Sequence, residues 1–364
     1  MDKLSKARQT INEVDKKMAE LFRLRMEAVR TVAEYKKERG LPVLDASREA
    51  EVLRRNEGYI GDEDLRSYYR LFLKTTMDIS KQYQHRLIEG ARVAYSGVEG
   101  AFAHIAAKKI FPDGTPVAHT DFEEAYRSVV CGECDYAVLP IENSYAGEVG
   151  QVMDLMFAGE LFVSGIYDLH ITQNLIGVKG ATLDGIHTVI SHPQALQQCE
   201  KYIHTHGFTQ VSATNTAKAA KEIAEKGDTY IAAIASRETA ALYGLSVLDH
   251  DINESAVNTT RFAVFSRVAG NDVSEKENTF LLLFQVRNVP GALASAINVI
   301  AAHGFNMKVL RSRPAKDQPF RYYFYIEAEG DETSDAGKSM LEELTSHCDM
   351  LKVAGRYKFE IDVT

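Results

Sequence analysis

Two cations on one predicted helix are the first residues in this sequence whose types and spacing suggest chemistry. Arg25 interrupts an apolar stripe that runs from Leu4 to Val32 with alternating spacings of three and four residues, the pattern of an amphipathic helix. Lys36 follows eleven residues later, about three turns plus 20° around the helix, so both cations share one face. A buried arginine without a partner is costly. The stripe therefore predicts either an ion pair with a neighbouring carboxylate or a site for a small anion.

This helix is too long to be covered by its own domain. Gly40 and Pro42 end it, and about 36 residues at about 1.5 Å each span about 54 Å, whereas a domain of about 90 residues is only about 30 Å across. Arg8 precedes Arg25 by about 26 Å, so one helix cannot bring both to one small ligand. We expect an intertwined helical homodimer, or a higher homo-oligomer, in which Arg8 of the partner subunit lies beside Arg25.

Polar residues recur at specific spacings over residues 1–90. They are Arg8, Arg25, Lys36, Asp45, Arg48, Glu49, Ser80 and Gln84. The pattern resembles the all-helical chorismate mutase family, which implies the rearrangement of chorismate to prephenate. That reaction needs clamps for two carboxylates and donors facing the ether oxygen, where negative charge develops. The resemblance implies that Arg25 and the partner's Arg8 hold carboxylates. It also implies that Lys36 and Gln84 face the ether oxygen and that Glu49 binds the ring hydroxyl.

Three further polar clusters lie at the ends of predicted strands. They occupy residues 141–147, 191–199 and 258–262, and their predicted site residues are Glu142, Asn143, Ser191, Gln198, Thr260 and Arg261. In open parallel α/β sheets, ligands bind at the carboxyl ends of strands. The clusters therefore indicate a binding site, with an ordinary polar loop as the alternative for any one of them.

Together with a glycine turn at residues 97–104, these clusters resemble the prephenate dehydratase family over residues 91–270. The resemblance implies two α/β lobes around a cleft, like solute-binding proteins of the periplasm, and the conversion of prephenate to phenylpyruvate. Aromatisation drives that reaction, so modest acid assistance to the leaving hydroxide suffices. Ala103 stands where the family usually has Ser or Thr, so one hydrogen bond is missing there.

The hydroxyl group of Thr260 is the predicted donor to the leaving group of the dehydratase reaction. Asn143, Ser191 and Gln198 are expected to hold carboxylates or the leaving hydroxyl. Arg261 alternates to the opposite face of the strand from Thr260, so a structural role and a role in the site are equally open.

A third set of residues lies near the carboxyl end of the chain. It comprises Asn288, Pro290, Gly291, Ala292, Leu293, Asn306, Arg311 and Ser312. The set resembles the ACT regulatory domain of phenylalanine-regulated dehydratases, which implies phenylalanine binding; a dimerisation module is the alternative. Pro290 at a helix start leaves backbone amides free for a carboxylate. Arg311 replaces the family's usual Glu, yet we expect phenylalanine still to bind and inhibit.

Three kinds of domain must position these residues. Residues 1–90 predict an all-α domain, and residues 91–270 alternate short apolar runs with helical stretches, which favours a parallel α/β domain. The predicted α/β strands are Val93–Tyr95, Tyr136–Leu139, Leu175–Val178, Thr188–Ser191, Tyr230–Ala235 and Arg261–Ser266. A polar linker at residues 269–278 leads into residues 271–364, whose βαββαβ order is the ferredoxin-like plan of α+β domains.

The composition fits a folded protein that acts on small molecules. The chain has 364 residues, of which 45% are hydrophobic and 26% charged, so disordered and fibrous classes are excluded. The net charge is −9, and residues 1–90 hold only 19 Lys and Arg against 16 Asp and Glu, too small an excess for a nucleic-acid footprint. No apolar run reaches the ~20 residues of a membrane span. We expect a cytoplasmic protein with no nucleic-acid or membrane partner.

No metal or cofactor is expected. Cys131 and Cys134 have no second pair of ligands nearby to complete a zinc site. Gly97 and Gly100 lack the third glycine of a dinucleotide fingerprint. The sequence thus predicts a bifunctional enzyme of phenylalanine biosynthesis with feedback inhibition by phenylalanine. The alternatives are a non-enzymatic metabolite sensor and an enzyme with only one active site.

Overall fold

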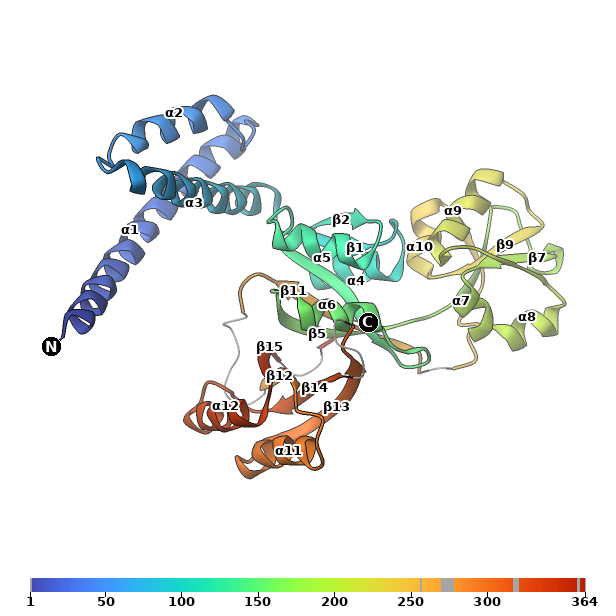
Figure 1. Cartoon of the computed structure of the whole chain (residues 1–364). Coiled ribbons are helices and arrows are strands. Elements are labelled where there is room, and N and C mark those ends of the chain that lie inside the picture. Colours follow the sequence, from blue (N-terminus) through green and yellow to red (C-terminus); the bar gives the residue numbers. More distant parts are fainter. Residues whose placement is uncertain (1, 256, 270–277, 317–320, 359–360, 364) are drawn as a thin grey trace. The chain divides into compact units, whose positions relative to one another are not determined.

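The computed structural model describes residues 2–255, 257–269, 278–316, 321–358 and 361–363. Contacts divide the chain into two compact units, Met1–Arg92 with Asp113–Thr115, and Val93–Pro112 with Pro116–Thr364 (Figure 1). The predicted linker at residues 269–278 falls almost wholly outside the described residues. Within the described part of the chain, no helix has both the length and the apolar character needed to cross a bilayer.

Within residues 2–90, the elements of the first unit are helices alone, in agreement with the predicted all-α domain. They are α1 (Lys3–Arg39), α2 (Ala46–Glu57) and α3 (Glu63–Glu89). Asp2 caps the amino end of α1 by accepting from the backbone N–H of Ser5, and Gly40 ends the helix in the left-handed conformation at φ 61°. The long apolar stripe thus forms one continuous helix of 37 residues.

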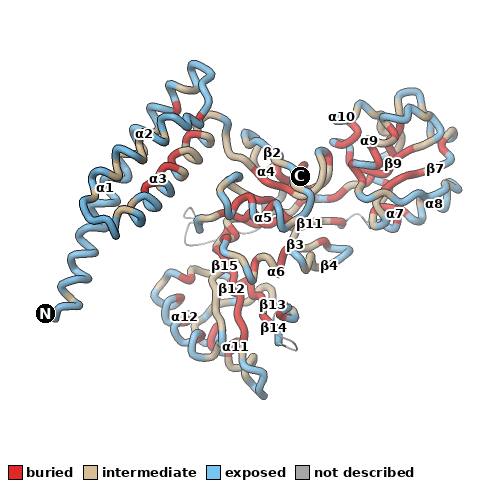
Figure 2. Tube along the Cα trace, turned by 45° about the horizontal axis from the view of Figure 1, so that its top comes forward, coloured by how far each residue is buried: buried red, intermediate tan, exposed pale blue. Residues whose placement is uncertain are grey.

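Most of the apolar stripe of α1 is uncovered in the single chain. Leu4, Ile11 and Leu21 are 58%, 57% and 64% exposed, and Ala33 is the buried residue of α1 (Figure 2). Side chains of α3 cover only part of the helix. An exposed apolar face of this length is typical of surfaces that bind another protein chain.

The second unit begins with a lobe built on a large mixed sheet. Its elements are β1 (Arg92–Ser96), α4 (Phe102–Ile110), β2 (Thr115–His119), α5 (Phe122–Val130), β3 (Tyr136–Asn143), β4 (Gly147–Glu148), α6 (Gly150–Ala158), β5 (Phe162–His170) and β11 (Thr259–Ser266). The sheet order is β13-β14-β12-β15-β5-β11-β3-β1-β2, so the lobe shares its sheet with the carboxyl-terminal module.

Two strands connect this lobe to the second one. β5 leaves the first lobe and β11 returns to it, and β11 pairs antiparallel with both β3 and β5. The predicted α/β lobe is present, with β1 and β3 parallel as expected, but its sheet is mixed because β11 runs antiparallel to both of its neighbours. The sequence analysis also missed β5, since Ser164, Gly165 and Asp168 interrupt its apolar run.

The second lobe has its own five-stranded sheet in the order β10-β6-β9-β7-β8. Its elements are β6 (Asn174–Gly177), η1 (Leu183–Gly185), β7 (Thr188–Ser191), α7 (Pro193–Gln198), α8 (Glu200–His206), β8 (Thr209–Ser212), α9 (Thr216–Lys226), β9 (Ile231–Ala235), α10 (Arg237–Tyr243) and β10 (Ser246–Asp249). Apolar clusters on both faces of the sheet form its core.

The carboxyl-terminal module has the predicted βαββαβ order. It contains β12 (Asn278–Gln285), α11 (Ala292–Ala302), β13 (Asn306–Pro314), β14 (Tyr322–Glu329), α12 (Asp335–His347) and β15 (Met350–Lys358), followed by β16 (Ile361–Asp362). β12 is buried along its whole length because Phe280, Leu282 and Phe284 pack against the helices, while Leu281 and Leu283 pack against the first lobe. The near-continuous apolar run of β12 reflects burial of both its faces.

We expect Gly355→Ala to weaken the junction between the module and the first lobe. β15 meets β5 where Gly355 pairs with Val163, and a methyl group at Gly355 would overlap the backbone of Val163. Overpacking of this kind costs about 1–3 kcal/mol. Hydrogen exchange of the β5 and β15 amides should rise in the variant. Gly61→Ala, where a methyl group meets nothing within 4 Å, is the control; equal protection in both variants would contradict the expectation.

Candidate functional site

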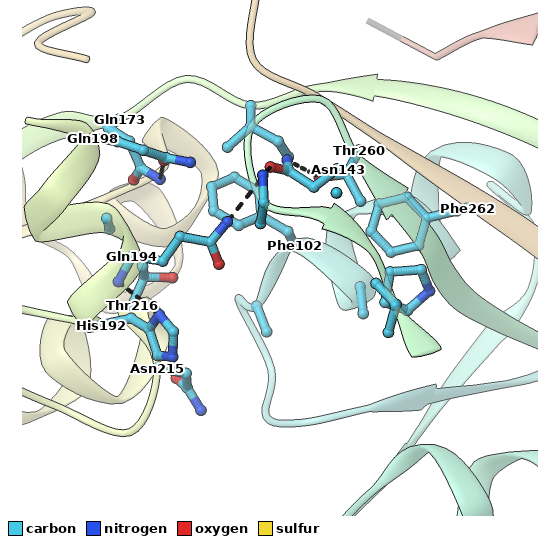
Figure 3. Close-up of a pocket in the computed structure, with 18 of the residues that line it drawn as sticks. Phe102, Asn143, Gln173, His192, Gln194, Gln198, Asn215, Thr216, Thr260 and Phe262 are labelled. Carbon is cyan, nitrogen blue, oxygen red and sulfur yellow. Dashed lines mark hydrogen bonds between the residues drawn. The ribbon is translucent and has the colours of Figure 1, made fainter. Parts of the chain in front are cut away.

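A cavity of about 350 Å³ lies between the two lobes of the second unit (Figure 3). From the first lobe, Phe102, Asn143, Thr260 and Phe262 line it. The second lobe and the connection after β5 supply Gln173, His192, Gln194, Gln198, Asn215 and Thr216. A cleft between lobes, with mainly apolar walls and a few convergent polar side chains, is a common form of small-molecule site.

Asn143 and Thr260 form a hydrogen-bonded pair at the cavity wall. They face each other across the β3–β11 ladder, and Asn143 Nδ2 donates to Thr260 Oγ1 at 2.9 Å. Asn143 Oδ1 accepts from the backbone N–H groups of Tyr145 and Ala146 at 3.0 and 2.9 Å, which fixes the orientation of the amide. Because Thr260 Oγ1 accepts from Asn143, the hydroxyl keeps its own proton for donation to a molecule in the cavity.

Amide side chains continue this network into the second lobe. Gln198 Oε1 accepts from Asn258 Nδ2 at 3.1 Å and from Gln173 Nε2 at 3.4 Å. Gln194 Nε2 donates to Asn143 Oδ1 at 3.5 Å, a contact that crosses the cleft (Figure 3). The network presents neutral donors and acceptors from both lobes.

Helix amino ends supply the favourable potential for anions. Asn215 caps the eleven-residue helix α9 by accepting from Lys218 N at 2.7 Å, and Thr216 begins that helix at the cavity wall. Ala101 and Phe102, at the amino end of α4, also line the cavity, and Ala101 provides no side-chain cap. Free backbone N–H groups and the helix dipole favour carboxylates at such ends. The cavity can therefore bind carboxylates without lining Lys or Arg side chains among the described residues.

His192 is a neutral member of the wall. Its Nδ1 accepts from the backbone N–H of Gln194 at 3.2 Å, so this nitrogen carries no proton. Burial lowers the pKa of His192 below its ordinary value of 6.5. The imidazole is therefore uncharged at neutral pH.

Three of the predicted dehydratase residues lie outside the wall of the cavity, and for Arg261 this agrees with the structural alternative that the sequence left open. The hydroxyl of Ser191 is fully buried and donates to Ile234 O at 2.6 Å, inside the second-lobe sheet. Arg261 faces away from the cavity, 3.6 Å from Glu142 and 3.2 Å from Glu327. Neither Ser191, Glu142 nor Arg261 lines the cavity. Strand alternation explains the positions of Glu142 and Arg261. Glu142 precedes Asn143 and Arg261 follows Thr260, so each faces the side of its strand opposite to the cavity.

Several lining residues were not predicted. Asn215 and Thr216 carried a recognisable helix-start signal after a strand, and His192 and Gln194 lie inside the motif that supplied Gln198. Gln173 gave no signal, because it follows β5, the strand that the sequence pattern did not reveal.

In the first unit, Arg25 contacts α3 rather than a carboxylate. Its Nη1 donates to the hydroxyl of Ser80 and, at 3.3 Å, to Thr76 O. Among the described residues no carboxylate lies within ion-pair distance of Arg25, and burial lowers the pKa of its guanidinium. Gln84 Nε2 donates to Ser80 O at 3.3 Å, while its buried Oε1 has no hydrogen-bond partner in the described chain. Arg25, Ser80 and Gln84 thus form a polar patch with capacity for an anion.

Three other predicted mutase residues have no hydrogen bond or ion pair with this patch among the described contacts. Lys36 Nζ donates to Val43 O at 2.6 Å, and Glu49 lies 3.0 Å from Lys81, a cation that the sequence analysis did not single out. Arg8 is exposed near the amino end of α1.

Two members of the predicted mutase set have local structural contacts on α2. Asp45 caps the helix by accepting from Arg48 N at 3.0 Å. Arg48 pairs with Glu51 at 2.7 Å.

The predicted effector residues gather around the start of α11 and along β13. Gly291, at φ 84°, is the amino-terminal cap of α11; Asn288 and Pro290 before it are exposed, and Ala292 and Leu293 form the first turn. On β13, Asn306 Nδ2 donates to Glu329 at 2.8 Å and Ser312 is exposed. Arg311 departs from the prediction.

Arg311 has its partner on the first lobe. Its Nη2 lies 2.5 Å from Glu142 Oε2. Alternation along β13 turns this side chain toward the dehydratase lobe, whereas Ser312 faces the other way.

The described residues hold no cluster of His, Cys, Asp and Glu suited to a metal ion.

Comparison with known proteins gives consistent matches. Residues 93–269 match the prephenate dehydratase family and residues 7–85 match chorismate mutase type II. The chain is 31% identical to the bifunctional chorismate mutase/prephenate dehydratase of Escherichia coli strain K12, over 97% of this chain and 95% of that protein. It is 33% identical to arogenate dehydratase/prephenate dehydratase 2 of Arabidopsis thaliana, over 73% and 72%. The solved prephenate dehydratase of Arthrobacter aurescens in complex with L-Phe is 28% identical, with a TM-score of 0.68 over 74% of this chain and 90% of that one.

The lowered pKa of His192 predicts how the enzyme activity at this cavity changes as the pH falls. Protonation of Nδ1 would remove the acceptor for Gln194 N–H, and the lowered pKa delays protonation to below pH 6.5. The value of kcat/KM for prephenate should therefore hold steady as the pH falls from about 8 to 6.5 and decrease only below. His192→Asn, which can cap without titrating, should remove the decrease. A decline centred above pH 6.5, or one unchanged in the variant, would count against this role.

Proposed function

Because this chain belongs to the bifunctional chorismate mutase/prephenate dehydratase family, we propose that its two reactions occur in separate units of the chain. Residues 1–90 would rearrange chorismate to prephenate, residues 91–270 would convert prephenate to phenylpyruvate, and residues 271–364 would form an ACT regulatory domain. The match of the two family models to different segments supports this division.

The hydrogen bond from Asn143 to Thr260 carries the proposal for the dehydratase. It leaves the proton of the Thr260 hydroxyl directed away from Asn143, available to the ring hydroxyl of prephenate as the C–O bond breaks. The ring carboxylate leaves as carbon dioxide, and its bonding electrons enter the ring. The ring hydroxyl leaves as hydroxide, hydrogen-bonded to Thr260, and a proton from the solvent converts the hydroxide to water. Threonine is a weak acid, so it acts as a hydrogen-bond donor while aromatisation supplies the driving force.

The carboxylates of prephenate match the remaining features of the cavity. The amino ends of α4 and α9 favour anions, and Gln194 and Gln198 offer amide groups from the second lobe. Because the donors come from both lobes, substrate bound between them holds the cleft closed around the reacting ring. Closure also excludes water from the leaving group.

For the mutase we propose a site shared between two chains. Arg25, Ser80 and Gln84 supply a polar patch, and Lys36 and Glu49 lie on neighbouring elements. The exposed apolar stripe of α1 supports an intertwined homodimer that brings Arg8 of the partner subunit to this patch.

We further propose that phenylalanine is a feedback effector bound near Gly291 and Ser312. The similar Arthrobacter enzyme was solved with L-Phe. The positive charge of Arg311 could oppose binding of the effector's ammonium group. Because its guanidinium is already paired with Glu142, this charge does not prevent binding.

The absence of disulfides among Cys131, Cys134, Cys199 and Cys348 agrees with a cytoplasmic enzyme.

Thr260→Val tests the dehydratase assignment. The change keeps the shape of the side chain but removes the hydroxyl, so dehydratase kcat should fall more than tenfold, a loss above ~1.4 kcal/mol. Phenylpyruvate formation from prephenate measures it, and mutase activity is the internal control. Arg25→Ala should give the reverse pattern. A Thr260→Val enzyme that keeps more than about a tenth of the rate would exclude Thr260 as the main donor.

Subunit mixing tests the shared mutase site. Arg8→Ala and Arg25→Ala homodimers should each be inactive as mutases. After exchange, about half of the dimers are mixed, and one of the two sites in each regains both arginines, so about a quarter of the wild-type activity should return. Native mass spectrometry verifies exchange. Verified exchange without recovery of activity would reject a site built from two chains.

A further inference from the structure

A short hairpin forms one wall of the dehydratase cavity. The end of β3 pairs with β4, so Glu142 lies opposite Glu148 and Asn143 lies opposite Gly147. Asn143, Gly147 and Glu148 line the cavity, and so does Ala146 at the tip. The position of this hairpin (residues 142–148) therefore sets where Asn143 meets a substrate and where Thr260 Oγ1 is held.

Two arginines of the carboxyl-terminal module hold the base of the hairpin. Arg311 pairs with Glu142 at 2.5 Å, and Arg313 pairs with Glu148 at 2.7 Å. The arginines are two residues apart on one face of β13, a separation of about 7 Å, so each reaches one of the two facing carboxylates. Their side chains are only 18% and 23% exposed, which strengthens charge pairing relative to the open surface.

Arg313 also fixes the helix that follows the hairpin. Its Nε lies 3.3 Å from Asp154 of α6, and Asp154 receives Lys316 at 2.9 Å and the Tyr323 hydroxyl at 3.1 Å. Burial alone would raise the pKa of Asp154, but these hydrogen bonds together lower it. The guanidinium of Arg313 lies directly against Gly150, where a methyl group would overlap it.

We infer that Arg311 and Arg313 are positioning residues for the dehydratase reaction, forming a two-point clamp on the hairpin through which the carboxyl-terminal module controls the cavity. This inference rests on the proposed dehydratase site and extends the proposed regulation. Ser312 lies between the two arginines on the opposite, exposed face of β13. A ligand bound on that face acts on the same strand that holds Glu142 and Glu148, so displacement of β13 reaches Asn143 without any intervening element.

Removal of one clamp contact should separate effector binding from inhibition. In Arg313→Gln we expect dehydratase kcat for prephenate to fall at least about tenfold, because the hairpin loses a charged hydrogen bond. Phenylalanine should still bind in calorimetric titration but change the remaining rate little. Arg321→Gln is the matched control, since Arg321 pairs with Asp349 in the same module and not with the hairpin. Thermal unfolding of the full-length variants, compared with that of the wild type, reports that the second unit of each variant is folded.

Two further variants distinguish positioning from general damage. Gly150→Ala removes no charge but displaces the Arg313 guanidinium, so it should lower the dehydratase rate in the same direction as Arg313→Gln but by a smaller factor. Arg313→Lys should restore part of the rate. In the double variant Glu148→Gln with Arg313→Gln, the loss should be clearly less than the product of the two single losses, because both remove the same contact.

The results that overturn the inference are specific. Dehydratase kinetics of Arg313→Gln equal to those of Arg321→Gln would refute the clamp. Loss of phenylalanine binding in Arg313→Gln would refute control of the cavity by the effector through β13, because the arginine would then belong to the effector site itself. If the wild-type enzyme bound no phenylalanine, the proposed effector and its control of the cavity through β13 would both be wrong. The prephenate kinetics of Arg313→Gln would still test whether the clamp positions the hairpin. Absence of wild-type dehydratase activity would refute the proposed function and the clamp alike.

Discussion

The pairing of β3 with β11 is the interaction on which the dehydratase unit depends. Its register sets Thr260 opposite Asn143 and Arg261 opposite Glu142. Successive residues of a strand face opposite sides, so this one register places the hydrogen-bonded pair in the cavity and the ion pair behind it. A slip of one residue would exchange the two faces and destroy both. The polar pair at the cavity, Asn143 with Thr260, and the ion pair of Glu142 with Arg261 are thus adjacent in sequence but lie on opposite faces of the sheet.

The charges behind the sheet join the carboxyl-terminal module to the first lobe. Arg261 is 12% exposed and Glu327 only 2%, and the hydroxyls of Tyr325 and Tyr357 donate to Glu327 at 2.6 and 2.7 Å. Burial raises the pKa of Tyr325 well above its ordinary value, so its hydroxyl remains a donor. Charges removed from water require such partners, and loss of one leaves the other uncompensated. The module therefore packs onto the lobe as part of one sheet and one apolar cluster, which suits it to regulate the cavity directly.

The helical unit follows a different principle. It encloses little core by itself: Ala33 of α1 and the α3 residues Leu73, Met77, Ser80 and Gln84 are buried, whereas most of the α1 stripe is exposed. Two of the buried α3 side chains are polar, and these are the ones that meet Arg25 or border it. In the proposed dimer, a second chain would cover the exposed stripe of α1 and complete the mutase site at the same time, so the proposal links oligomerisation to mutase chemistry.

The sequence by itself predicted the all-α character of residues 1–90, the βαββαβ order of the carboxyl-terminal module, the motifs that contain Asn143, Gln198 and Thr260, and the apolar stripe interrupted by Arg25. These are local properties, since helix periodicity, capping and short motifs depend on residues a few positions apart. Only the tertiary structure decided that Ser191 is buried against β9, that Gln173 lines the cavity, and that Arg311 pairs with Glu142. Each of these depends on which face of a strand meets which neighbour. That choice is made by packing between segments distant in sequence, and no local pattern encodes it.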